Sequence, residues 1–99
     1  MKKLSFTEFK NSLGSTDVPA NLSRHEKALW FAGKAEWEKA HEIVQDLNDR
    51  YAAQIHAYLH RQEGDSANAS YWYSKAGTAF PQSSLDIEWE DLVRLILGS

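Results

Sequence analysis

Apolar side chains recur every three or four residues along most of the chain, which is the period of an amphipathic helix. The pattern is clearest near the end, where Leu85, Trp89, Leu92 and Ile96 follow one another at helical spacing. The acidic residues between them, Glu88 among them, are expected to face water. No stretch shows the apolar and polar alternation of a half-buried strand. The pattern therefore predicts an all-α fold.

Capping residues, glycines and prolines divide this pattern into six expected helices. Ser5 followed by Glu8 is a capping-box pattern that predicts a short helix ending at Gly14. Pro19 predicts the start of a second helix, which ends near Gly33. The other four are expected over residues 36–47, 50–63, 66–77 and 85–97. At 99 residues the chain is predicted to form one helical domain over residues 1–99.

Two segments of the chain resemble each other and also resemble a tetratricopeptide (TPR) turn, which joins the two helices of a hairpin. They are residues 35–40, Ala-Glu-Trp-Glu-Lys-Ala, and residues 64–69, Gly-Asp-Ser-Ala-Asn-Ala. The resemblance covers about residues 24–81 and implies TPR-like antiparallel hairpins, with 85–97 as a capping helix. Residues 53–77 are also similar to a group of small uncharacterised bacterial proteins. This second similarity implies no activity.

Small and aromatic positions around the second turn support this resemblance. Tyr73, Ala76 and Pro81 follow Ala69 at the family's spacing, and Ala57 stands where the family has a small residue in the first helix. Small side chains allow two helices to approach closely. The sequence therefore predicts a tight crossing in which Ala57 contacts Ala69.

The TPR resemblance also implies a groove for a protein or peptide partner, lined by the first helix of each hairpin. Arg61 is expected to hold a partner's carboxylate there, because a guanidinium forms a bidentate fork. By position, the implied groove residues are His25 and Leu29 from one hairpin, and Tyr51, Gln54, Tyr58, Arg61 and Gln62 from the other.

Histidines form a second constellation. His56 and His60 are four residues apart and share a helix face, with Glu63 next along it. If the TPR-like hairpins form, His41 faces the same space. This arrangement favours a set of partly buried, hydrogen-bonded histidines, and the alternative is a zinc site formed by His41, His56 and His60.

Composition and charge exclude several other functions. A net charge of -3 and a pI near 5.7 give no basic surface for nucleic acid or an anionic membrane, and neither partner is expected. The chain has no Cys, no Gly-x-Gly loop and no nucleophile–base–acid set, so no catalytic residue is assigned. Without a signal-like or membrane-length apolar run, a cytoplasmic location is expected.

Three functions therefore stay open. The first is a TPR-like interaction or scaffold module, and the second is a small metal-binding protein or metal-dependent enzyme that uses the histidines. The third is a homo-oligomer.

Three consecutive aromatic residues, Tyr71, Trp72 and Tyr73, span too much of a helix to share one core, so at least one must face something else.

Overall fold

The computed structural model describes residues 4–98, and within that range it contains helices and no strand, which confirms the all-α prediction. None of these helices has the length and apolar character required to cross a bilayer. In chain order they are α1 (Phe6–Ser12), α2 (Arg24–Gly33), α3 (Trp37–Gln45), α4 (Arg50–Gln62), α5 (Ser66–Ala76) and α6 (Leu85–Leu97).

Side-chain caps set where most of the helices begin. Ser5 and Glu8 form the expected capping box at α1. The second helix, expected to start after Pro19, begins at Arg24, because Ser23 and Glu26 form another capping box there.

The turns within the two hairpins, α2–α3 and α4–α5, have the same backbone geometry. Ala35 and Gly64 occupy equivalent positions and both have left-handed φ values, of 61° and 86°. The next amide N–H in each turn donates back across the helix end, Glu36 to Phe31 at 2.9 Å and Asp65 to His60 at 2.8 Å. This is the 6→1 hydrogen bond of a Schellman motif. The repeat seen in the sequence is therefore also a repeat of local structure.

Helices α4 and α5 make the most extensive helix pairing among residues 4–98. Ala57 and Ala69 are both fully buried, and they form one cluster with Tyr73. Their methyl groups leave room for the two backbones, and the Tyr73 ring fills the space beside them.

Replacing Ala57 by leucine should overpack this crossing and lower the free energy of unfolding by about 1 to 3 kcal/mol. The measurement is a urea denaturation midpoint, with Ala67→Leu on the exposed side of α5 as the control. An Ala57→Leu midpoint equal to that of the control would show that the two helices do not meet at Ala57.

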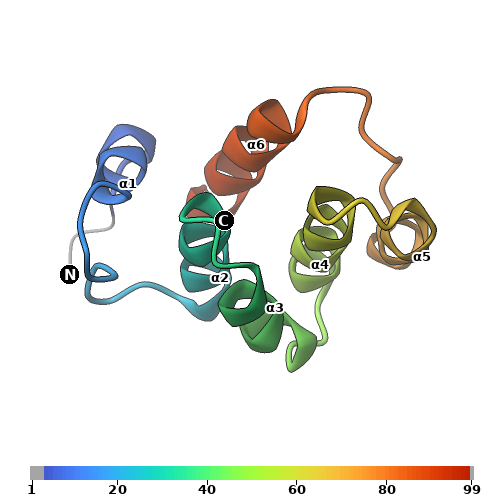
Figure 1. Cartoon of the computed structure of the whole chain (residues 1–99), viewed down its shortest axis with the longest axis horizontal. Coiled ribbons are helices and arrows are strands. Elements are labelled where there is room, and N and C mark those ends of the chain that lie inside the picture. The colour runs from blue at the N-terminus through green and yellow to red at the C-terminus, as the bar shows by residue number, and fades with distance from the viewer. Residues whose placement is uncertain (1–3, 99) are drawn as a thin grey trace.

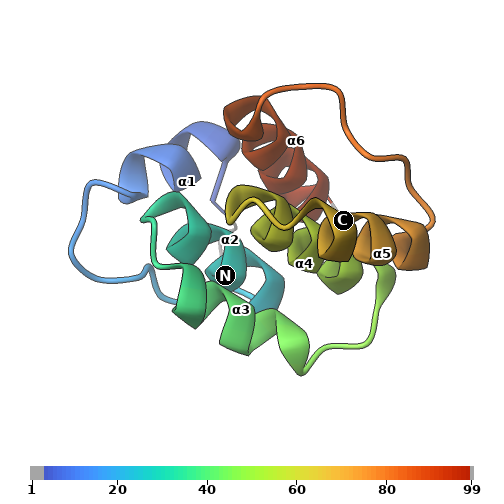
Figure 2. The ribbon, with the colours of Figure 1, turned by 45° about the vertical axis from the view of Figure 1, so that its right-hand side comes forward.

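Helix α6 lies across α2 and α4, on the side away from α3 (Figures 1 and 2). The Trp89 indole N–H donates to the Leu29 carbonyl at 2.8 Å, and its ring packs beside Phe9 of α1. Gly33 allows this approach, because a Cβ at that position would lie 2.9 Å from the Trp89 ring. Helix α6 thus closes the face that the first helices of the two hairpins share.

Candidate metal centre

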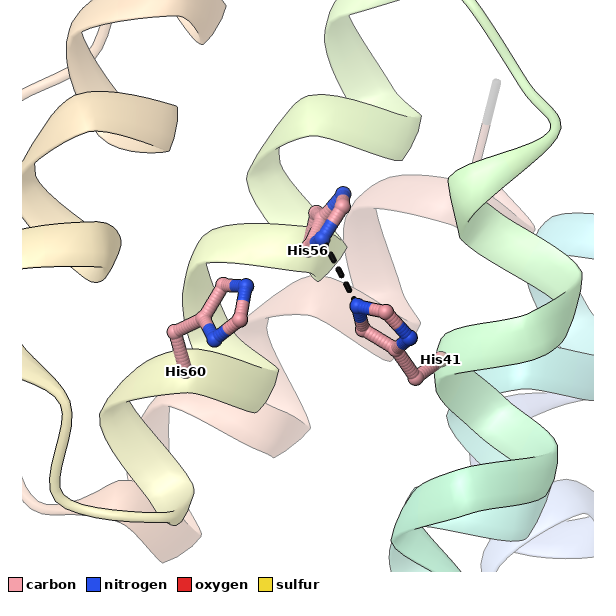
Figure 3. A group of neighbouring side chains, drawn as sticks. All are labelled: His41, His56 and His60. Atoms are coloured by element: carbon pink, nitrogen blue, oxygen red, sulfur yellow. Dashed lines mark hydrogen bonds between the residues drawn. The ribbon is translucent and has the colours of Figure 1, made fainter.

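Three histidine rings converge between the two hairpins (Figure 3). His41 projects from α3, while His56 and His60 project from successive turns of α4. The potential ligand nitrogens of the three residues all lie within 4.8 Å of one another. Nε2 of His41 and Nε2 of His56 are 3.0 Å apart, so one ring donates a proton to the other. The convergence of these three histidines, which was expected from the sequence, is therefore confirmed. Metal binding stays a prediction.

A carboxylate fixes the orientation of the third ring. Nδ1 of His60 lies 2.7 Å from Oε2 of Glu63, one turn further along the chain. With its proton on Nδ1 and donated to Glu63, His60 carries its lone pair on Nε2, the nitrogen that faces the other two rings in Figure 3. In many metal sites a carboxylate holds a ligand histidine in this way.

Two tryptophans hold the other rings. Trp37 stacks on His41 with centroids 4.7 Å apart, and Trp72 stacks on His56 at 4.0 Å. The Trp37 indole N–H donates to the Leu59 carbonyl at 2.7 Å, which anchors that ring to α4. The histidine orientations are therefore set by packing as well as by hydrogen bonds.

Burial and neighbouring charged groups favour the neutral forms of His41 and His56. The pKa of His56 is lowered to about 4 by burial first, and then by the neighbouring His41, His60 and Lys75. The pKa of His41 is also lowered, by burial and by His60, against the opposing effect of Glu63 and Glu42. At neutral pH both rings hold the uncharged form that coordinates metals.

The nitrogen spacing is close to that of a coordinated ion. Tetrahedral zinc, with Zn–N bonds of about 2.0 Å, holds its ligand atoms about 3.3 Å apart. The 3.0 Å between His41 and His56 needs to open by only a few tenths of an ångström. His60 would have to close the remaining distance, from within 4.8 Å. Three protein ligands would leave a fourth position for water or another donor.

Two features next to the three histidines complete this region. His60, Glu63 and Asp65 form an overlapping group within 4.8 Å, but Asp65 already caps α5 by accepting from the amide N–H and the side chain of Asn68. A cleft of about 180 Å³ borders His56 and runs along Trp72 toward the α3–α4 turn.

The structure corrects the groove prediction at three positions. Leu29 is fully buried and Tyr58 is 4% exposed, both in a core that α6 helps to form. Arg61 binds Glu88 of α6 at 2.7 Å and also donates to the Ser83 carbonyl, so its guanidinium is not presented to a partner. The TPR resemblance implied an open groove, and the sequences of α2 and α4 carry no sign that α6 covers this face.

The other predicted groove residues lie at the edges of this face. His25 is 2.9 Å from both carboxylate oxygens of Asp49, and Tyr51 packs against the core. Gln54 and Gln62 are half-buried on α4.

The packing of three side chains, Trp37, Trp72 and Glu88, was not predicted from the sequence. Trp37 and Trp72 have the helical spacing of core residues, and their stacking on imidazoles has no separate sequence signal. Glu88 was expected to face water but is 5% exposed. A glutamate among other acids on an amphipathic helix looks like part of the solvated face.

Comparisons of the chain with protein-family models, with curated proteins and with solved structures give no match.

Proposed function

We propose that this protein binds a divalent transition-metal ion through His41, His56 and His60. The observation that carries the proposal is the approach of three imidazoles from two hairpins, with ligand nitrogens all within 4.8 Å. The hydrogen bond from His60 to Glu63 supports it, because it turns the second nitrogen of His60 toward the other rings.

The donor set favours zinc. Three neutral imidazoles suit borderline ions such as zinc, copper and nickel, whereas magnesium and calcium prefer oxygen ligands. The cluster is closed on two sides by Trp37 and Trp72, and neither of these rings supplies a competing ligand atom. A fourth position open to water is compatible with metal binding alone or with hydrolytic chemistry.

The competing interpretation is a metal-free cluster in which the histidines only satisfy one another. The 3.0 Å contact between His41 and His56 supplies one hydrogen bond, and Glu63 supplies another to His60. On that interpretation the same residues stabilise the hairpin packing, and zinc has no effect on the protein.

Calorimetric titration of the metal-free protein with zinc should give one site at about pH 7.5 and much weaker binding at about pH 5.5, because protons compete for the imidazoles. His60→Ala should abolish binding. Glu63→Ala should weaken it by about 10- to 100-fold, because the ring that it orients is released. His25→Ala is the matched control, since the fourth histidine pairs with Asp49 outside the cluster and should leave binding unchanged.

Absence of a binding heat at the higher pH, together with a His60→Ala variant less stable than wild type, would reject the metal site and support the hydrogen-bonded cluster. Equal losses of zinc affinity in His60→Ala and His25→Ala would indicate that zinc binds elsewhere on the chain.

We also propose that the two hairpins are TPR-like repeats, supported by the shared turn geometry at Ala35 and Gly64. A protein-interaction role then has to use surfaces other than the face that α6 covers. Tyr71, which is 58% exposed on α5, is the most accessible aromatic side chain among residues 4–98 for such a contact or for self-association. The Ala57→Leu test bears on this relationship as well.

A further inference from the structure

A cleft of about 410 Å³ lies where α1, α2, α4 and α6 meet. Tyr58 and Gln62 line it from α4, and Asp86 and Trp89 line it from α6. Because Tyr58 is two residues from His56, it projects about 200° around the helix from it, so this cleft lies on the opposite face of α4 from the histidines. Its volume is in the range of small-molecule sites.

Gln62, which lines the cleft, carries an unmet hydrogen-bond acceptor. Oε1 of Gln62 is buried and has no hydrogen-bond partner. Buried polar atoms are nearly always paired in folded proteins, and a group without a partner carries a desolvation penalty. A ligand that donates a hydrogen bond to this atom would remove that penalty.

The cleft also holds a carboxylate that is not neutralised. Lys10 pairs with Glu90 at 2.6 Å, whereas the Asp86 carboxylate makes no hydrogen bond or ion pair within residues 4–98. Burial first, and then Glu88 and Asp86, raise the pKa of Tyr58 to about 12 against the opposing effect of Arg61. A cation is therefore favoured over an anion.

An aromatic wall completes the cleft. Trp89 and Gly33 both line it. An indole face attracts both hydrocarbon and a cationic head. The residues lining this cleft include no group of three ligands placed for a metal ion among residues 4–98, so the cation it suits is an organic one.

We propose that this cleft binds a small organic primary ammonium compound. Its N–H groups would donate to Gln62 Oε1 and to the Asp86 carboxylate, and its hydrocarbon part would pack on Trp89. The site is separate from the histidine cluster and does not depend on metal binding.

The test is an NMR titration of the whole chain with n-butylammonium and, in parallel, with n-butanol, which has a similar hydrocarbon chain and no charge. We expect n-butylammonium to shift the Gln62 side-chain amide and the Trp89 indole N–H in a saturable manner, and n-butanol to bind about tenfold more weakly. Asp86→Asn and Gln62→Met should each weaken n-butylammonium binding by about tenfold. Asp91→Asn, on the exposed side of α6, is the matched control and should leave it unchanged.

Equal binding of the two compounds would overturn the proposal, because charge would then play no part. The same conclusion follows if Asp86→Asn binds as tightly as Asp91→Asn, or if neither Gln62 nor Trp89 responds. Asp86 is exposed and makes no bond within residues 4–98, so its variant should keep the wild-type fold.

Discussion

Replacing Arg61 by methionine is expected to lower the free energy of unfolding by about 3 to 5 kcal/mol. Glu88 is 5% exposed, and its carboxylate accepts from Arg61 at 2.7 Å and from the Tyr73 hydroxyl at 2.5 Å. Removal of the guanidinium leaves a buried charge with only a neutral donor, and it also removes the bond from α4 to the Ser83 carbonyl. Urea denaturation followed by circular dichroism measures the loss.

Two further variants test the cause. Lys39→Met removes an ion pair of similar length, 3.0 Å to Glu36, but with both side chains exposed, and should cost about 0.5 kcal/mol or less. The double variant Arg61→Met with Glu88→Gln should recover most of the loss, because the amide that replaces the carboxylate is neutral and still accepts from Tyr73. A single Arg61→Met variant as stable as Lys39→Met would show that the buried pair does not hold α6 in place.

The Arg61–Glu88 pair also shows what a sequence can and cannot predict about this surface. The expected chemistry, a guanidinium holding a carboxylate, is present, but the carboxylate is Glu88 of the same chain. Helix periodicity predicted α6 because it is a local property of residues 85–97. Where that helix docks depends on contacts such as Trp89 with Leu29, which are 60 residues apart and leave no local pattern.

More of the histidine cluster could be predicted from the sequence. His56 and His60 share a face for reasons of helix geometry alone, and Glu63 continues that face. Predicting that His41 joins them also required the packing of α3 on α4, which the resemblance implied. The tryptophans that stack on these rings were not predicted, because stacking depends on side-chain orientation across helices.

The metal-free protein is expected to lose stability as the pH falls from about 6.5 to about 4. Burial and the neighbouring His41, His60 and Lys75 lower the pKa of His56 from 6.5 to about 4 in the folded state. Between these two values the unfolded chain binds a proton at His56 that the folded chain does not, so the free energy of unfolding decreases as the pH decreases. The acidic groups facing the cluster, Glu63 and Glu42, act in the opposite direction at His41.

A shift of this size corresponds to a loss on the order of 3 kcal/mol across that range, with no further loss from His56 once the pH is below about 4. Urea midpoints at several pH values, measured with a chelator present, give the slope of the free energy of unfolding against pH. His56→Gln should flatten it, because the variant has no group to titrate there, while His25→Gln should retain it. Wild-type urea midpoints that stay constant over this pH range would mean that His56 can carry a charge in the folded state. His56 would then be more open to water than its packing against Trp72 implies. If zinc binds as proposed, saturating zinc should steepen the wild-type slope, because acid then also displaces the ion from the folded state.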